Sequence, residues 1–315
     1  MTLINPSTNA RPFPALEKGH DCRSRASLVL PKPIRYSLRK GWLILCLACL
    51  CCSRKLPAQN EKLASPPSVF PPGESLAYEV KWDPPAWMFF LPSFTAGQMT
   101  LRCQKHFQYQ GRGAYLFSAD AVSSGFLPKL TGLTVNDYFE SIVEAENFCS
   151  MRMYKKTQEG KRRFEMTQTF HPGQTTGHLL IQDGRKDPPK ITRDDEVQNL
   201  PPCVQDLVSV VYHARLRPLQ PGGTYPVTLC ETGKLRNFEI RVSRGESLKT
   251  LVGTLPTLRV DGVSKPGVLF KEGGHFAIWV TDDQRKIPVR YEIKVKLGRV
   301  FGDLIRIENI AKSGG

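Results

Sequence analysis

Residues 289–297 read Val-Arg-Tyr-Glu-Ile-Lys-Val-Lys-Leu, and every second side chain in this stretch is apolar. Successive side chains of a β-strand point to opposite faces of a sheet, so this alternation predicts a strand with one buried and one wetted face. Strict alternation is typical of antiparallel sheets that pack one face on a core, whereas buried parallel strands are apolar throughout. Shorter runs of the same kind occur at residues 76–82, 99–103, 115–119, 238–242 and 276–280. The sequence therefore predicts a mainly β protein whose curved antiparallel sheets form an open barrel or a sandwich.

Glycine and proline clusters separate these runs, as expected if tight turns join short strands. A hairpin is expected to close at residues 282–286. The charged stretch 183–196, which contains Pro188 and Pro189, is expected to be an exposed excursion. Further turns are expected at residues 111–113, 172–173, 183–184, 221–223 and 261–262.

One segment departs from the two-residue period. Prolines at 201, 202 and 218 bound this segment, and proline is favoured just before and just after a helix. We predict one amphipathic helix over residues 203–217, packed on the sheet and joining two β-rich halves. Its apolar stripe at helical spacing consists of Val204, Leu207, Val208, Val211 and Ala214.

The composition narrows the class of protein further. The chain has 315 residues, of which 40% are hydrophobic, so neither a polytopic membrane protein nor a wholly disordered chain fits. The net charge is +15, but residues 1–59 hold ten basic and only two acidic residues, and so carry +8 of it. A modest excess spread over the remaining body, without a nucleic-acid-binding motif, argues against nucleic acid as a partner.

An apolar run at residues 41–52 follows Arg39 and Lys40 and is shorter than the ~20 residues needed to cross a bilayer. It predicts a signal-peptide core within a leader of residues 1–58, cleaved after Ala58, and export to the periplasm or cell envelope. Lipid attachment at Cys49 and a retained signal anchor are the alternatives. The long stretch before the run suggests an over-extended translation start. Residues 59–72 are expected to be a proline-rich tether, and residues 73–310 a single β-rich domain.

Four cysteines follow the leader: Cys103, Cys149, Cys203 and Cys230. An even number in an oxidising compartment is compatible with two disulfides, and four cysteines have three connectivities among which the sequence does not choose. Buried free thiols are the alternative, because a free cysteine commonly packs as a small apolar side chain.

A wider set of residues resembles a family of bacterial exported proteins catalogued as domain of unknown function 3108. The similarity covers about residues 70–307. It implies a β-rich protein of the envelope and brings no established activity, ligand or catalytic residue. The residues that carry it are Gly73-Glu74, the alternating run 76–82, Ala96-Gly97, Tyr138 with Glu140-Ser141, Gln205-Asp206 with Ser209, Tyr212 and Arg215, and Ile278-Trp279 with Asp282-Asp283, Arg285 and Pro288.

The polar face of the predicted helix carries Asp206, Ser209, Tyr212 and Arg215. Asp206, Ser209 and His213 have the spacing to project from one side of a helix, as a hydrolase triad would require. Nothing resembles a G-x-S-x-G nucleophile elbow, so an unrecognised hydrolase is the least favoured function. The structural alternative pairs Asp206 with Arg215 or a neighbouring strand and buries the Tyr212 ring.

Asp282, Asp283 and Arg285 could bind a cation or an anionic head group, since carboxylates ligate hard metals and arginine binds phosphate. A calcium-loop pattern is absent, and aspartates at turns bond their own backbone, so a hairpin turn is the favoured interpretation. The six histidines show no zinc-binding spacing. No metal and no cofactor are predicted.

Aromatic residues crowd residues 87–94, between Pro84-Pro85 and Pro92. The candidate ligand-binding side chains are Trp87, Phe89, Phe90 and Phe94. We expect them to be packed in the core, because most aromatic side chains are buried. The alternative is an exposed lip that contacts lipid or a protein partner.

These observations favour a non-enzymatic envelope protein whose concave sheet holds a lipid or another apolar ligand, because barrels and sheet mouths commonly form such pockets. The alternative is a structural or assembly module that recruits envelope proteins through its sheet edges. The sequence leaves the oligomeric state open.

Overall fold

The computed structural model describes residues 69–88, 90–125, 134–250, 253–264, 275–294 and 298–310. Several predictions fall outside these ranges. They concern the leader 1–58 with its apolar run 41–52, the tether up to residue 68, Phe89, and the end of the quoted stretch at residues 295–297.

Most of the described chain is β-strand, as the alternating runs predict. The first eight strands are β1 (Glu74–Asp83), β2 (Phe94–Tyr109), β3 (Arg112–Ser123), β4 (Asn136–Glu144), β5 (Ser150–Glu159), β6 (Arg162–Phe170), β7 (Gly177–Asp183) and β8 (Lys190–Val197). The later strands are β9 (Thr224–Glu231), β10 (Lys234–Arg244), β11 (Leu248–Thr250), β12 (Gly253–Leu255), β13 (Thr257–Ser264), β14 (His275–Thr281), β15 (Pro288–Lys294) and β16 (Arg299–Glu308).

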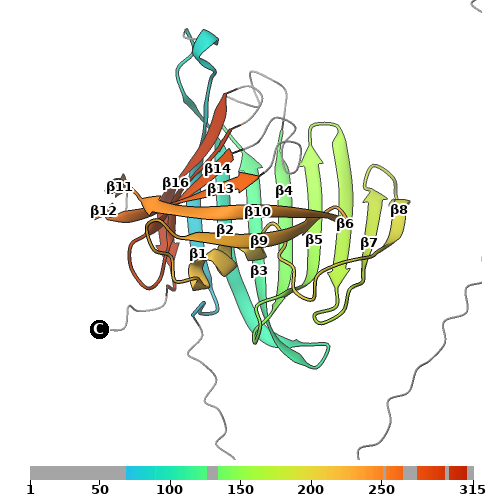
Figure 1. Ribbon diagram of the computed structural model, residues 1–315. Helices are drawn as coiled ribbons and strands as arrows, with labels where there is room; N and C mark the ends of the chain where they lie inside the picture. Colours follow the sequence, from blue (N-terminus) through green and yellow to red (C-terminus); the bar gives the residue numbers. More distant parts are fainter. Residues whose placement is uncertain are drawn as a thin grey trace, which may run out of the picture. The chain divides into compact units, whose positions relative to one another are not determined.

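Fourteen of these strands form one antiparallel sheet in the order β8-β7-β6-β5-β4-β3-β2-β1-β16-β15-β14-β13-β10-β9 (Figure 1). Strands β1 to β8 form a continuous meander, and β16 returns to pair with β1 near the middle of the sheet. Strands β8 and β9 are the two edges, so the sheet is not closed into a barrel. Strands β11 and β12 form a separate small hairpin. The predicted fold class is confirmed in its open form.

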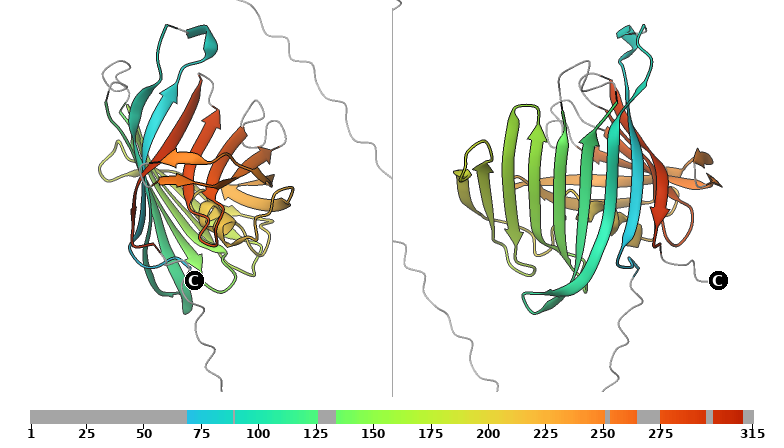
Figure 2. Two further views of the ribbon diagram at one scale, coloured as in Figure 1. Left: turned by 90° about the vertical axis from the view of Figure 1, so that its left-hand side faces the viewer. Right: turned by 180° about the vertical axis from the view of Figure 1, so that it is seen from behind.

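The sheet curls so that the β9–β10 hairpin crosses in front of the earlier strands (Figures 1 and 2). At the tip of this hairpin the Gly233 N–H donates to the Gln168 side chain on β6 at 3.2 Å. Arg193 on β8 donates to the Thr232 carbonyl at 3.3 Å. Buried side chains of both halves, such as Leu179 on β7 and Cys230 on β9, belong to one cluster, so the core lies between the halves.

The largest fully buried side chains of this core come from alternate positions of the strands, as the two-residue period requires. Tyr78 on β1, Phe117 on β3, Met166 on β6 and Leu179 on β7 are all less than 3% exposed. The opposite face carries ion pairs such as Arg102–Asp120.

One predicted turn differs from the structure. Residues 261–262 lie inside β13 and pair with both β10 and β14. The Phe276 ring of β14 packs where a Gly262 side chain would stand: a Cβ at Gly262 would lie 2.0 Å from ring carbons. Glycine here serves close packing rather than a turn. The charged stretch 183–196 is mostly exposed, as expected, and it also contains most of the edge strand β8, which pairs with β7 on one side. Its many charged residues are typical of a sheet edge.

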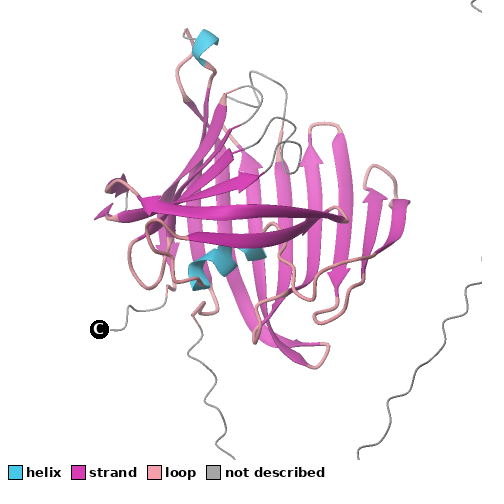
Figure 3. Cartoon of the chain, viewed as in Figure 1, coloured by secondary structure: helices cyan, strands magenta, loops and turns pink. Residues whose placement is uncertain are grey.

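Two helices occur in the described residues: the 3₁₀ turn η1 (Ala86–Met88) and α2 (Ser209–Leu216) (Figure 3). Helix α2 lies in the connection between β8 and β9, but it is shorter than the predicted range 203–217. Gln205 is extended and pairs with β9, where its N–H donates to the Thr228 carbonyl at 3.0 Å. The Asp206 carboxylate then accepts the N–H groups of Val208 and Ser209, which starts the helix.

Candidate functional site

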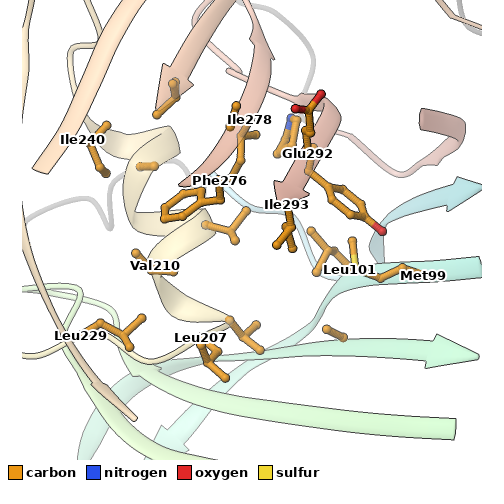
Figure 4. Close-up of a pocket in the computed structure, with 18 of the residues that line it drawn as sticks. Met99, Leu101, Leu207, Val210, Leu229, Ile240, Phe276, Ile278, Glu292 and Ile293 are labelled. Carbon is orange, nitrogen blue, oxygen red and sulfur yellow. The ribbon is translucent and has the colours of Figure 1, made fainter. Parts of the chain in front are cut away.

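A cavity of about 380 Å³ lies between α2 and the concave face of the sheet (Figure 4). Its volume is within the ~300–1,000 Å³ of typical ligand pockets, and it is partly open to solvent. The lining side chains are almost all apolar. They come from β1 to β4 (Tyr78, Met99, Leu101, Ala119, Phe139), from α2 and the residues before it (Leu207, Val208, Val210, Val211, Ala214) and from β9 to β15 (Leu229, Phe238, Ile240, Val260, Phe276, Ala277, Ile278, Tyr291, Ile293).

The local sequence explains why this wall is apolar. Met99 and Leu101 are alternate residues of β2, and Phe238 and Ile240 are alternate residues of β10, so each pair points to the same face of its strand. Four residues of the predicted helical stripe also line the cavity: Leu207, Val208, Val211 and Ala214. The stripe therefore faces the sheet without filling the space beneath it.

Little polar surface faces the cavity, and two of the polar groups at this wall have partners elsewhere. The Tyr78 hydroxyl donates to the Pro288 carbonyl at 2.8 Å. The Tyr291 ring packs edge-on against Tyr78, with ring centroids 5.7 Å apart. Burial raises the pKa of each of these two phenols well above the ordinary value. The Glu292 carboxylate points away from the cavity in Figure 4 and lies 3.4 Å from Arg299. A ligand inside the cavity would therefore contact carbon.

The aromatic cluster lies elsewhere. Trp87 and Phe90 are each 66% exposed, so the expectation that they are buried is wrong. Both belong to the connection between β1 and β2, which projects from the sheet (Figure 1). Phe94 is half-buried and packs on Trp82, with ring centroids 5.2 Å apart. The surrounding prolines interrupt strand pairing, which directs this segment away from the sheet. None of the three lines the cavity. As ligand-binding residues they stay a prediction, and they would act outside it.

Asp206 is buried at the start of α2 and binds the sheet. Its carboxylate accepts the hydroxyl of Ser141 on β4 at 2.5 Å and that of Ser150 on β5. Burial raises its pKa above the ordinary value, and the hydrogen bonds from the hydroxyls and from two backbone N–H groups offset only part of that shift. The expected pairing of Asp206 with a neighbouring strand is found.

Arg215 has a different partner from the one considered in the sequence. Its guanidinium forms a bidentate ion pair with Glu74 on β1, with N–O distances of 2.5 and 3.0 Å. Its Nε donates to the Arg285 carbonyl at 3.2 Å, and the Phe70 ring lies 4.8 Å from the guanidinium carbon. Tyr212 is buried and stacks on Phe117, with centroids 3.8 Å apart. The polar face of α2 thus attaches the helix to the sheet.

The contacts of Ser209 and His213 do not support a catalytic triad. Ser209 Oγ accepts the backbone N–H of Asp206 at 2.8 Å, and His213 Nε2 lies 2.9 Å from Arg217 Nη2. Within the described residues no hydrogen bond joins Ser209 to His213, so the serine has no base to activate it.

His213 should make the protein less stable in mild acid. Burial, with the nearby Arg217 charge, lowers the pKa of His213 to about 4, against 6.5 for a free imidazole. The unfolded chain therefore takes up this proton first, and stability that is complete above pH 6.5 is lost as the pH falls towards 4. We expect the urea midpoint to fall between pH 7 and pH 5 by more in the native chain than in His213→Gln. Equal falls in the two proteins would contradict this role.

The residues expected at the hairpin turn stabilise that turn. Asp283 accepts the backbone N–H of Arg285 at 3.0 Å and its guanidinium at 2.6 Å, and also the Thr281 hydroxyl at 2.7 Å. Although burial opposes it, the Arg285 charge and the Thr281 hydroxyl lower the pKa of Asp283. The Asp282 N–H donates to the Pro256 carbonyl at 3.0 Å. Among the residues that the structure describes, no three His, Cys, Asp or Glu side chains are grouped so as to hold a metal ion.

The four cysteines divide between the two alternatives. Cys149 and Cys203 form a disulfide that ties the β4–β5 connection to the segment before α2. Cys103 and Cys230 are buried free thiols. The Cys103 thiol donates to the Phe70 carbonyl, and burial raises its pKa to about 12, so it stays protonated.

Comparison with one solved structure supports the fold. The chain is similar to a beta-barrel-like protein of domain of unknown function DUF1849 from Brucella abortus, with a TM-score of 0.52 and 10% identity over 78% of this chain and 100% of that one. It also matches, at a TM-score of 0.33 and 9% identity, a protein from Bacteroides fragilis described as exported with a YmcC-like fold, over 76% of this chain and 97% of that one. A third match, at 0.32 and 11%, is described as a lipoprotein from Parabacteroides distasonis and covers 76% of this chain and 98% of that one.

No curated protein matches the sequence. In the described ranges, neither helix is long and apolar enough to cross a membrane. The family model described as a protein of unknown function, DUF3108, matches residues 77–305, which take in strands from β1 to β16 together with α2 and the cavity that it covers. The chain therefore belongs to the DUF3108 family.

Proposed function

We propose that the protein is an exported binding module that holds an apolar ligand, such as a lipid acyl chain, in the cavity beneath α2. The apolar cavity of about 380 Å³ is the observation that carries this proposal. Each methylene group moved from water into such a space contributes about 0.8 kcal/mol. A buried polar group without a partner costs several times that amount, so the wall selects for hydrocarbon.

The size of the cavity distinguishes it from ordinary packing. Protein interiors are close-packed, and few of their voids exceed a water molecule. The stripe on α2 and the inner faces of β2, β10 and β14 leave far more space than that between them. A hydrocarbon chain would restore the missing contacts.

Export is supported by two independent features. The Cys149–Cys203 disulfide belongs to an oxidising compartment, because cytosolic thiols are kept reduced. The apolar run at residues 41–52, preceded by basic residues, is typical of an export signal. We therefore propose a location in the periplasm or at the envelope, reached by a cleaved leader; a lipoprotein or a retained anchor would place the same domain there.

Recruitment of proteins through the sheet edges has less support. The β8 edge carries Lys190, Arg193, Asp194 and Asp195 within eight residues, and charges of this kind discourage strand addition. Part of the β9 edge is already paired with Gln205. The contacts of the described residues give no reason to propose a reaction.

Placing a carboxylate in the cavity wall should weaken ligand binding strongly. Val210 on α2 is half-buried and lines the cavity. We expect Val210→Glu to weaken binding of the neutral fluorescent probe N-phenyl-1-naphthylamine at least tenfold, because a charge beside hydrocarbon must be desolvated. Fluorescence titration measures the effect.

Leu216→Glu is the matched control, because it makes the same change on the same helix at an exposed position outside the cavity. It should bind the probe as the native protein does. Binding that is equal in all three proteins, or absent from the native one, would overturn the proposal. Native mass spectrometry of protein purified from its own envelope should in addition show a retained lipid.

A further inference from the structure

Lys155 lies on the concave face of β5, beside the cavity. In the antiparallel register it stands opposite Phe139 on β4 and Met166 on β6. Phe139 lines the cavity. The Lys155 ammonium lies 5.2 Å from the centroid of the Phe139 ring and 5.7 Å from that of Phe164. A cation therefore stands next to the apolar wall.

No carboxylate neutralises this ammonium at ion-pair distance within the described ranges, whereas its neighbour Lys156 pairs with Glu165 at 3.5 Å. Two carboxylates near the Asp137–Gln158 contact have other partners. Asp137 accepts the backbone N–H of Gln158 at 2.8 Å; burial raises its pKa, and the Lys155 charge lowers it only in part, without an ion pair. Glu159 lies 3.4 Å from Arg162 on the next strand.

The two aromatic rings hold the cation without using its hydrogen-bond donors. A lysine ammonium has three N–H donors, and an aromatic face attracts it through the ring quadrupole alone. Lys155 is half-buried, so part of its charge is already removed from water. An anion at this position would gain more from the ammonium than it would from a fully hydrated lysine.

We propose that Lys155 binds the carboxylate or phosphate head group of a single-chain amphiphile whose hydrocarbon chain occupies the cavity. This inference rests on the proposed function and adds the charge of the ligand. The cavity wall offers the chain only carbon, so a charged head group must stay outside it, at the rim. Lys155 supplies the complementary charge beside Phe139, which lines the cavity.

The test compares ligands that share a twelve-carbon chain: laurate, dodecyl phosphate and neutral dodecanol. We expect Lys155→Met to weaken at least one of the two anions about tenfold and to leave dodecanol unchanged. Methionine keeps an unbranched chain over the two rings and removes only the charge. Lys155→Arg should restore most of the anion affinity. The anion that loses more affinity identifies the head group.

Lys156→Met is the matched control, because Lys156 is adjacent in the chain but on the opposite face of β5. It should bind all three ligands as the native protein does. If dodecanol binds and Lys155→Met leaves both anions unchanged, the role of Lys155 is refuted while the cavity proposal stands. If none of the three ligands binds the native protein, the proposed function itself fails.

Discussion

Arg215→Met should lower the free energy of unfolding by about 3–5 kcal/mol, the cost of breaking a buried ion pair by removing one partner. The side chains of Arg215 and Glu74 are 2% and 0% exposed. Without the guanidinium, the Glu74 carboxylate would remain buried and uncompensated. The contact between Arg215 and the Phe70 ring would also be lost. Urea unfolding at neutral pH measures the change.

Arg241→Met is the control for this experiment. Arg241 also pairs with a carboxylate, that of Glu239, but both side chains are more than half exposed. Exposed pairs contribute about 0–1 kcal/mol, so this variant should unfold almost as the native protein does. The double variant Glu74→Met, Arg215→Met should be more stable than Arg215→Met alone, because it leaves no unpaired charge. Arg215→Met unfolding within 1 kcal/mol of the native protein would show that the pair does not hold α2 to β1.

Replacing both Cys149 and Cys203 by serine should cost about 4 kcal/mol of stability. The disulfide joins residues 54 positions apart and so restricts the unfolded chain strongly; the loop-entropy relation gives about 4 kcal/mol for a loop of this length. The bond also anchors the segment from which Asp206 binds Ser141 and Ser150. Its loss should therefore loosen the start of α2.

Urea unfolding with and without reductant measures this effect. The native protein with reductant should match the double serine variant, and the variant should not respond to reductant. Cys103 and Cys230 serve as internal references, because both are buried and should react with a thiol reagent only on unfolding. A native protein whose midpoint does not change on reduction of the bond would contradict the prediction.

Much of the fold could be predicted because the signal is local. Residues 289–294 alternate within one strand, and each position shows which face it occupies without knowledge of its partners. The helical spacing of the apolar stripe is a local signal of the same kind. It correctly placed four residues that line the cavity on one apolar face. The helix start was not predicted, because Gln205 pairs with β9, a contact that helical spacing does not encode.

The errors concern residues whose environment depends on distant parts of the chain. Trp87 and Phe90 are apolar, but their exposure follows from the direction in which the β1–β2 hairpin projects. Gly262 was predicted to be a turn residue, but its role is to leave room for the Phe276 ring of the neighbouring strand. Arg215 could have paired with Asp206, and only the fold placed Glu74, 141 positions away in the sequence, beside it.

By itself, the sequence determined a sheet with one apolar face, a short amphipathic helix to cover it, and the family to which the chain belongs. Those properties depend on periodicity and on residue identity, and each short segment of the sequence shows both without knowledge of the others. The tertiary structure alone decided that the helix and the curled sheet leave an apolar cavity, and that Lys155 stands beside it. The volume left between packed faces and the register of neighbouring strands arise from contacts between segments far apart in the chain, so no single segment encodes them.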